Sequence, residues 1–184
     1  MPTFRGFIAI EIQSTQKILE FENEIRKTGA DVKLVEPHNI HITLKFLGGT
    51  QENQIESIEH IIKQAGKGIR PFFITLKGTG VFPNENYLKV VWIGIIDNGV
   101  IETIGLSIDE QLSHLGFMRE NRGFSPHLTI GRVKTARNKQ PLLHTIQKYR
   151  DVEFSTEQVR SITLKKSELT PQGPIYTTLR EVLF

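Results

Sequence analysis

The sequence predicts an α+β fold in which two pseudo-symmetric lobes enclose a cleft. Two observations support this prediction. Segments typical of strands and helices follow one another in the order strand, helix, strand, helix, strand, and this order occurs twice, at roughly 1–88 and 89–184. A short motif, His-x-Thr followed by an apolar residue, lies on the middle strand of each half, at His41 and His127. We therefore expect one bilobal domain over residues 1–184, built from two approximate sequence repeats.

The first half opens with the apolar segment from Phe7 to Ile12, which is typical of a strand. A helix should follow, with Ser14 as its N-cap and Gly29 at its end. The next strand carries the first motif from Ile40 to Leu47, and we expect it to stop at the glycine pair that begins with Gly48.

The first half closes with a second helix and a third strand. The helix should run from about Gln51 to Ala65, with Thr50 as its cap and an isoleucine stripe on one face. The segment from Phe72 to Phe82 is typical of a strand, and its two internal glycines predict a bend or bulge.

The second half repeats this order. We expect a strand from Leu88 to Ile95, an amphipathic helix from Val100 to Leu115, and the second motif strand ending at Val133. A short helix should open at Pro141, and a late strand should span Val159 to Leu169.

The spacings of the two halves agree closely. Ile8 precedes His41 by 33 residues, and Trp92 precedes His127 by 35. The threonines of the later "ITLK" segments follow these histidines by 34 and 36 residues. Such order also arises by chance in α+β chains, but the agreement at both offsets favours a duplication.

Composition indicates a folded protein without disulfides. Apolar residues make up 38% of the 184 residues and charged residues 23%, which fits a globular chain. The absence of cysteine excludes disulfides and Cys-based zinc sites. No apolar run approaches the roughly 20 residues of a membrane helix, and the first residues lack the features of a signal peptide. We expect a cytoplasmic monomer with no membrane contact.

The positive charge is concentrated around the second motif. The net charge is only +3, yet six cations and one anion, Glu120, lie between Arg119 and Lys139. The cations of this basic stretch are Arg119, Arg122, Arg132, Lys134, Arg137 and Lys139. They suggest an anionic partner, and a solvated basic loop is the alternative.

Alternation along a strand separates the polar and apolar residues of the first motif. His41, Thr43 and Lys45 should share one face. The apolar face should carry Ile40, Ile42, Leu44 and Phe46. We expect this strand to alternate without interruption, so that an imidazole and a hydroxyl lie side by side above the core.

The second motif places His127 and Thr129 on one face in the same way. If the halves are related by a pseudo-two-fold axis, the two His–Thr pairs face each other across the cleft. One imidazole can then accept a proton while the other donates one, as in-line displacement at phosphorus requires. The threonine hydroxyls can donate hydrogen bonds to phosphate oxygens. No Asp/Glu/His cluster has metal-ligand spacing, so we expect no metal.

The other four histidines have no threonine two residues later. His38 is interpreted as a turn residue, and His60, His114 and His144 as helix-surface residues. Two matches among six histidines are weak evidence alone. The equivalent positions of both matches in the repeated pattern strengthen the interpretation.

The chain resembles a known family, the 2H phosphoesterases, and within it the bacterial and archaeal RNA 2′,3′-cyclic phosphodiesterases, also called 2′-5′ RNA ligases. The matching segments are "RGFIAIEI", "NIHITLKFLG", "FSPHLTIGR" and "KKSELTPQGPIYTTL", which together span nearly the whole chain. The resemblance implies antiparallel sheets lining a V-shaped active-site cleft, with helices on the outer face of each lobe. It also implies hydrolysis of a terminal 2′,3′-cyclic phosphate of RNA to a 2′-phosphomonoester, with weak reversible 2′-5′ joining in some members.

Carried over by position, the resemblance assigns a role to each motif residue. His41 would be the proton donor to the departing 3′ oxygen, and His127 the proton acceptor that activates water. Thr43 and Thr129 would bind the phosphate oxygens. Arg132 stands where family members often place an arginine that binds the phosphate.

Three residues have alternative interpretations. Alternation turns Arg132 away from the phosphate, and a bulge at Gly131 could turn it back; a surface salt bridge is the alternative. Phe7 could stack on a base, although a core position is favoured. For Tyr176, packing is favoured over substrate contact.

Three other functions use the same residues. The site could join RNA through a 2′-5′ linkage, hydrolyse a small cyclic nucleotide, or bind RNA without catalysis. The sequence lacks G-x-x-x-x-G-K-[ST], which argues against an ATP-driven ligase and against a nucleotide cofactor.

Overall fold

The computed structural model describes residues 2–120 and 123–184, a mixture of strands and helices in this part of the chain. The strands are β1 (Thr3–Glu11), β2 (Val32–Leu34), β3 (His41–Gln51), β4 (Phe72–Asn84), β5 (Tyr87–Ile96), β6 (His127–Val133), β7 (Glu153–Val159), β8 (Ser161–Thr170) and β9 (Gly173–Leu183). The helices are α1 (Gln16–Lys27), α2 (Ile55–Ala65), α3 (Val100–Ser113) and α4 (Lys139–Lys148), with short 3-10 helices η1 (Pro37–Asn39) and η2 (Glu52–Gln54).

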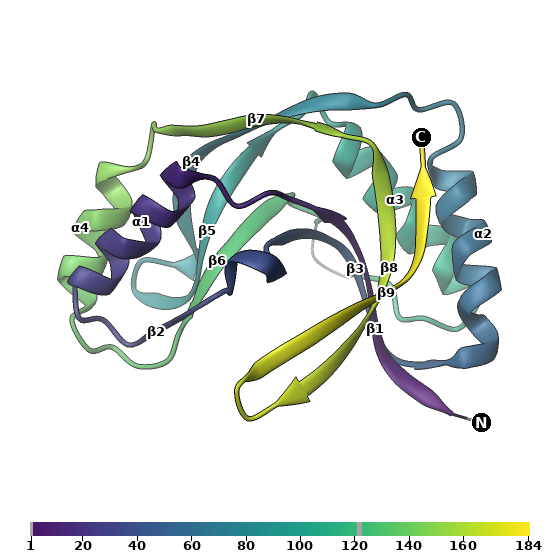
Figure 1. The fold of residues 1–184 in the computed structure, drawn as a ribbon, viewed down its shortest axis with the longest axis horizontal. Helices are drawn as coiled ribbons and strands as arrows, with labels where there is room; N and C mark the ends of the chain where they lie inside the picture. The colour runs from purple at the N-terminus through teal and green to yellow at the C-terminus, as the bar shows by residue number, and fades with distance from the viewer. Residues whose placement is uncertain (1, 121–122) are drawn as a thin grey trace.

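The strands pair antiparallel in the order β7-β4-β5-β6-β3-β1-β8-β9, and β2 pairs with β6. The sheet is strongly curled, and its two parts meet where β6 pairs with β3 through Ile42 and Leu128. Helices α1 and α4 cover the outer side of the β4–β7 part, and α2 and α3 cover the part that contains β1, β3 and β8 (Figure 1). The predicted α+β class with antiparallel strands and outer helices is confirmed.

Each part of the sheet combines strands from both halves of the chain. β4 lies beside β5, and β8 lies beside β1. The division into repeats 1–88 and 89–184 stays a prediction about the sequence, because the spatial grouping of the strands crosses that boundary.

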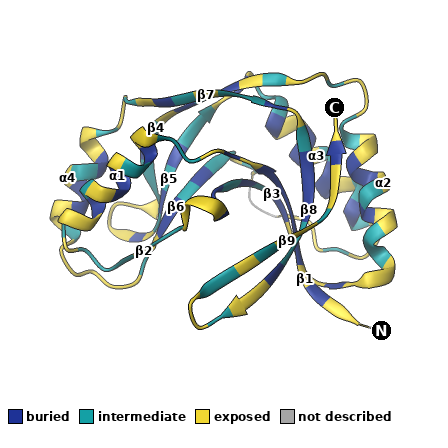
Figure 2. Ribbon diagram, viewed as in Figure 1, coloured by how far each residue is buried: buried dark blue, intermediate teal, exposed yellow. Residues whose placement is uncertain are grey.

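The core lies between the sheet and the four helices of the described chain. Buried residues gather on the central strands and on the helix faces that look toward the sheet (Figure 2). The isoleucine stripes account for this pattern: Ile18 and Ile25 of α1, like Ile58 and Ile62 of α2, are at most 1% exposed. These stripes position the outer helices and leave the inner face of the sheet for the site.

Both predicted N-caps of the first half are wrong by one residue. Thr15, not Ser14, caps α1, because its hydroxyl accepts a hydrogen bond from the backbone N–H of Ile18. Gln51, not Thr50, begins the second helical segment by sharing a capping box with Gln54. In each case two adjacent residues can cap, so the local pattern alone does not decide between them.

The predicted end of the first motif strand is also wrong. β3 continues through Gly48 to Gln51, because β1 begins at Thr3 and pairs along this whole stretch. Gly48 has a φ of +67°, so the strand crosses a bulge here and does not end.

Three strands, β2, β7 and β9, were missed by the sequence prediction, which expected none between the first helix and the first motif strand and only one, from Val159 to Leu169, near the end of the sequence. The structure has β7 before this segment and β9 after it, and both lie at the ends of the strand order. An edge strand has one unpaired side and carries polar residues, as in the β7 sequence "EFSTEQV". Its apolar pattern is therefore weak. The bulge expected between Phe72 and Phe82 is confirmed, because the pairing of β4 with its neighbours β5 and β7 shifts register after Leu76.

Candidate active site

The two predicted motifs meet at the junction of β3 and β6, where the residues that follow the histidines are Cα partners. Continued by one residue on either side, this antiparallel register places His41 across from Thr129 and His127 across from Thr43. All four side chains line one cavity of about 710 Å³. Two segments 86 residues apart in the sequence thus form a single site.

The two histidines are oriented in the same way. Nδ1 of His41 lies 2.7 Å from the carbonyl oxygen of Asn39, and Nδ1 of His127 lies 2.8 Å from that of Ser125. A carbonyl oxygen only accepts hydrogen bonds, so each Nδ1 must carry the hydrogen. Each Nε2 is then the ring nitrogen that can accept or donate a proton in the cleft.

Aromatic rings hold both imidazoles. Phe7 and Tyr176 lie 5.0 and 5.4 Å from His41, centroid to centroid, and the tyrosine contacts it edge-on. Phe82 contacts His127 in the same edge-on manner at 4.9 Å. Phe7 is 3% exposed, which confirms its expected core position, although it also lines the cavity. Sequence reasoning missed Phe82, which lies on β4 and reaches His127 across the intervening strand β5.

Burial lowers the pKa of His41, because the charged imidazolium loses solvation there. The hydrogen bond to Asn39 opposes this effect, and the positive charges of Lys165 and Arg132 add to it. In the free protein at neutral pH, His41 is therefore a neutral imidazole whose Nε2 bears a lone pair. Burial also raises the pKa of Tyr176, so its hydroxyl stays protonated.

Arg132 lines the cavity, and a bulge in β6 accounts for its position. In β6, Thr129 pairs with Trp92 of β5, and Gly131 pairs with Val91. Two successive residues of β5 therefore face three residues of β6, and Ile130 is the extra one. The bulge shifts the alternation and places Arg132 on the side of the threonine. Glycine is required at 131, because a Cβ there would lie 2.7 Å from a side-chain carbon of β2.

The expected uninterrupted alternation of β3 is wrong. Ile8 pairs with Lys45 and Ala9 with Thr43, so Leu44 is an extra residue, and the faces exchange beyond it. Lys45 turns toward α3 and is buried, whereas Phe46 is 55% exposed and lines the cavity. The residues before the bulge keep their predicted faces: His41 and Thr43 line the cavity, and Ile42 is buried in the core.

Five cations line the cavity, and three of them come from outside the predicted basic stretch; one of the three, Lys45 of β3, is paired with Asp109. Arg132 and Lys134 belong to the stretch, whereas Arg5 lies on β1 and Lys33 on β2. Lys33 is the Cα partner of Arg132, which places both on the same edge of the cavity. Their combined charge suits an anionic ligand.

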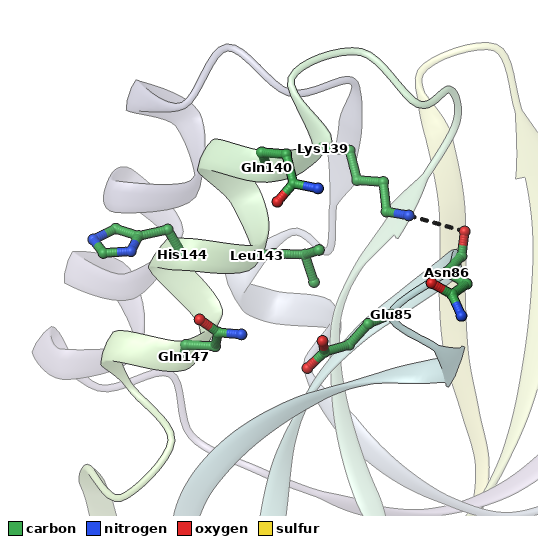
Figure 3. Close-up of a pocket in the computed structure, with 7 residues that line it drawn as sticks. All are labelled: Glu85, Asn86, Lys139, Gln140, Leu143, His144 and Gln147. Carbon is green, nitrogen blue, oxygen red and sulfur yellow. Dashed lines mark hydrogen bonds between the residues drawn. The ribbon is translucent and has the colours of Figure 1, made fainter.

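Other cations of the basic stretch lie elsewhere. Arg119 contacts the carboxylate of Asp109. Lys139 lies at a second, smaller pocket between α4 and the β4–β5 turn, where it donates a hydrogen bond to the carbonyl of Asn86 (Figure 3). Arg122 lies outside the described residues.

The β8–β9 hairpin walls one side of the cavity and projects beyond the rest of the sheet (Figure 1). Asn39 ties it down, because its side-chain amide donates to the carbonyl of Pro174 at 3.1 Å. The same hairpin carries Tyr176. Tyr176 thus packs against His41, as expected, and also lines the cavity. No pattern in the sequence indicated that this hairpin contacts the first motif.

Within residues 2–120 and 123–184, the structure shows no group of three or more His, Cys, Asp or Glu side chains able to hold a metal ion. Nor does that part of the chain contain a helix long and apolar enough to span a membrane.

Two histidines, two threonines and an arginine thus line one cavity at the junction of β3 and β6, which is the arrangement expected of a two-histidine phosphoesterase. The family comparison agrees, since the model of the 2′-5′ RNA ligase superfamily matches residues 6–168. The chain belongs to this superfamily.

Similar proteins and structures were found across nearly the whole chain. It is 45% identical to a Methanocaldococcus jannaschii protein named RNA 2′,3′-cyclic phosphodiesterase, over 96% of this chain and 99% of that protein. A protein of the same name from Methanothermobacter thermautotrophicus is 38% identical, covering 95% and 96%. The crystal structure of TT0787 from Thermus thermophilus superposes with a TM-score of 0.77 at 27% identity, covering 97% of both chains. E. coli LigT complexed with 3′-AMP, at 21% identity and a TM-score of 0.75, shares the fold over 99% and 98%.

Proposed function

We propose that this protein hydrolyses the 2′,3′-cyclic phosphate at the end of an RNA to a 2′-phosphomonoester, by acid–base catalysis between His41 and His127. The observation that carries the proposal is the matched orientation of the histidines, each with Nδ1 bound to a carbonyl and Nε2 left for proton transfer. The names of the relatives with 38–45% identity support it.

In the proposed reaction, Nε2 of His127 accepts a proton from water, and the water oxygen attacks phosphorus. The bond from phosphorus to the 3′ oxygen breaks, and His41 donates its Nε2 proton to that oxygen. Thr43 and Thr129 donate hydrogen bonds to the non-bridging oxygens, and Arg132 binds the negative charge that builds on them.

The proton donor must be protonated before the reaction, although burial lowers the pKa of His41 in the free protein. A bound phosphate anion favours the imidazolium form of a neighbouring histidine and so raises its pKa. Bound substrate therefore favours the imidazolium form that His41 needs as the proton donor.

The proposal is tested with an RNA that ends in a 2′,3′-cyclic phosphate, incubated with pure protein and EDTA. We expect a 2′-phosphate product, and His41→Ala or His127→Ala should lower the rate about 10²- to 10⁴-fold. His60→Ala on α2, remote from the motifs, is the matched control and should leave the rate unchanged. Equal activity of the motif variants and wild type, or no 2′-phosphate at all, would refute the proposal.

A second candidate reaction is 2′-5′ joining at the same site, which the description of the superfamily suggests. By microscopic reversibility a 5′-hydroxyl would replace water as the nucleophile. Adding an RNA with a free 5′-hydroxyl and analysing the products at equilibrium separates joining from hydrolysis. Binding without turnover would instead indicate a non-catalytic RNA-binding module.

We also propose that the protein acts as a cytoplasmic monomer without metal or nucleotide cofactor. The complete site on one chain supports this, since all four motif residues line a single cavity. Light scattering at micromolar concentration tests the monomer, and activity of EDTA-treated protein without added nucleotide tests the cofactor claim.

A further inference from the structure

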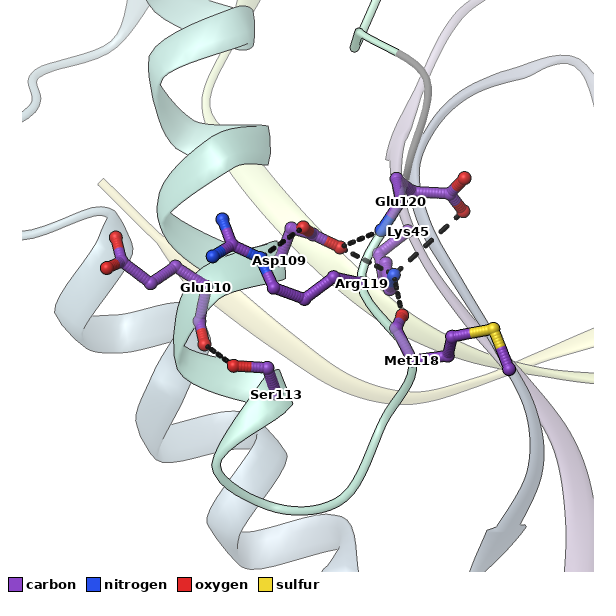
Figure 4. A network of polar contacts seen from close by, with 7 residues as sticks. All are labelled: Lys45, Asp109, Glu110, Ser113, Met118, Arg119 and Glu120. Atoms are coloured by element: carbon purple, nitrogen blue, oxygen red, sulfur yellow. Dashed lines mark hydrogen bonds and ion pairs between the residues drawn. The ribbon is translucent and has the colours of Figure 1, made fainter.

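A buried ion pair joins the strand of the first motif to helix α3. Nζ of Lys45, four residues after His41, lies 2.5 Å from Oδ1 of Asp109, and the two side chains are 2% and 9% exposed (Figure 4). Removing two such charges from water costs several kcal/mol, and apolar residues of similar size often stabilise such a position as well or better. Stability alone therefore does not account for this pair.

The pair holds the residues that follow α3 (Figure 4). Nζ of Lys45 donates to the carbonyl of Met118 at 2.6 Å. Asp109 accepts from the backbone N–H of Glu120 at 3.1 Å and from Nε of Arg119 at 3.5 Å. Burial alone would raise the pKa of Asp109, but these hydrogen bonds, led by that of Lys45, outweigh it and lower the pKa. Asp109 is thus an ionised acceptor that, together with Lys45, ties down three successive residues.

Helix α3 provides a second anchor one turn earlier. A Cβ on Gly105 would lie 3.0 Å from the ring of Phe124, so the ring packs against bare helix backbone. Positions 105 and 109 lie on the same face of the helix, because they are four residues apart. The helix therefore holds residues 118–120 through Asp109 and residue 124 through Gly105. We call residues 118–120 and 123–126 the connecting segment.

The connecting segment orients the second histidine. Its residues belong to no helix or strand, so their position depends on such anchors. Ser125, which immediately precedes the proline before β6, supplies the carbonyl that binds Nδ1 of His127 at 2.8 Å. If this carbonyl moves, Nδ1 loses its hydrogen-bond acceptor. The ring hydrogen can then reside on Nε2 instead, which removes the lone pair that accepts a proton in the cleft.

We propose that Lys45 and Asp109 are positioning residues: through the connecting segment they set the tautomer and orientation of His127 relative to His41. The inference rests on the proposed function, in which His127 is the base. The pair connects the two motifs. Lys45 lies on β3, the strand that carries His41, and Asp109 binds the backbone of the segment that precedes His127.

The test is a double variant, Lys45→Met with Asp109→Leu, which removes both charges and keeps the volume. Three quantities are measured: kcat and KM with the cyclic-phosphate RNA, the melting temperature, and the ¹⁵N chemical shifts of the histidine rings, which report the tautomer. We expect kcat to fall about 10- to 100-fold with little change in KM, because a small misplacement of a catalytic group has such effects. The His127 ring should become a mixture of tautomers, and the His41 ring should stay unchanged.

Lys63→Met is the matched control, because it breaks an ion pair with Glu59 on the exposed surface of α2. It should change neither kcat nor the ring shifts. Asp109→Asn, which preserves the shape of the side chain, replaces the double variant if the latter does not fold, with the same expected shifts.

A folded variant with wild-type kcat and a wild-type His127 tautomer would overturn the inference and leave the pair a purely structural feature. A loss of kcat with an unchanged tautomer would overturn it as well. The ring shifts need no turnover, so failure of the proposed function, seen as an inactive wild type, is distinguishable from failure of the positioning role.

Discussion

Glu22 is a buried carboxylate that burial destabilises in its charged form. It lies on α1 at 0% exposure, and within the described structure neither carboxylate oxygen has a hydrogen-bond partner. The nearest cation is Arg26, with Nη2 at 3.8 Å from Oε2. Burial raises the pKa of Glu22 from 4.5 to about 7; Arg26 opposes the increase and Glu36 adds to it. Replacing Glu22 with glutamine removes the charge and keeps the shape.

The sign and size of the effect follow from these two pKa values. Between pH 4.5 and about 7 the folded state binds a proton that the unfolded chain has released, so the free energy of unfolding falls as the pH rises. Above that window both states are ionised and the whole penalty is present, about 3 kcal/mol at 1.36 kcal/mol per pH unit. Glu22→Gln should therefore be more stable than wild type by up to about 3 kcal/mol near pH 8.5, and about equal near pH 5.

Thermal unfolding followed by circular dichroism from pH 5 to 9 measures this difference. For a chain of this size we expect the melting temperature of Glu22→Gln to exceed that of wild type by about 6–12 °C at the alkaline end. Glu20→Gln, on an exposed position of the same helix, is the control and should change the stability by less than about 0.5 kcal/mol. If the melting temperatures of Glu22→Gln and wild type change in parallel with pH, burial does not raise the pKa of this carboxyl group and the prediction is wrong.

Three further substitutions test contacts around the cleft. Arg132→Ala should lower kcat/KM about 10- to 100-fold in steady-state assays, because an arginine bound to phosphate is lost; an unchanged value would place Arg132 outside the site. Asn39→Ala removes the hydrogen bond to Pro174 and should lower the free energy of unfolding by about 1–2 kcal/mol in a urea titration, and no change would mean that the hairpin is held by other contacts. Gly80→Ala would place a Cβ 2.2 Å from the ring of Trp92, and the same titration should show a loss of about 1–3 kcal/mol; wild-type stability would show that the ring can move aside.

Local patterns were sufficient to predict most elements and the motif residues. The isoleucine stripes of α2 and α3 and the apolar run of β1 each bury a face against the sheet, so their periodicity survives in the sequence. The edge strands β7 and β9 have no such constraint and were missed. The N-caps were misplaced by one residue because Ser14 and Thr15, like Thr50 and Gln51, are local competitors.

The bulges decided the faces of the side chains, and no local pattern predicts them completely. Gly131 drew attention to a possible bulge in β6, and the structure has one there, which brings Arg132 to the cavity. The bulge at Leu44 has no glycine to mark it. It arises from how β1 pairs with β3, and it turns Lys45 away from its predicted face and into the ion pair with Asp109.

The sequence by itself determined the two His–Thr pairs, because alternation along a strand is a property of the backbone and acts within each segment alone. Only the tertiary structure decided what surrounds them. The pairing of β3 with β6 brings the motifs together, the carbonyls of Asn39 and Ser125 select the ring nitrogen that faces the cleft, and α3 holds the connecting segment. These contacts join residues far apart in the chain, and their geometry depends on strand register and packing that no single segment specifies.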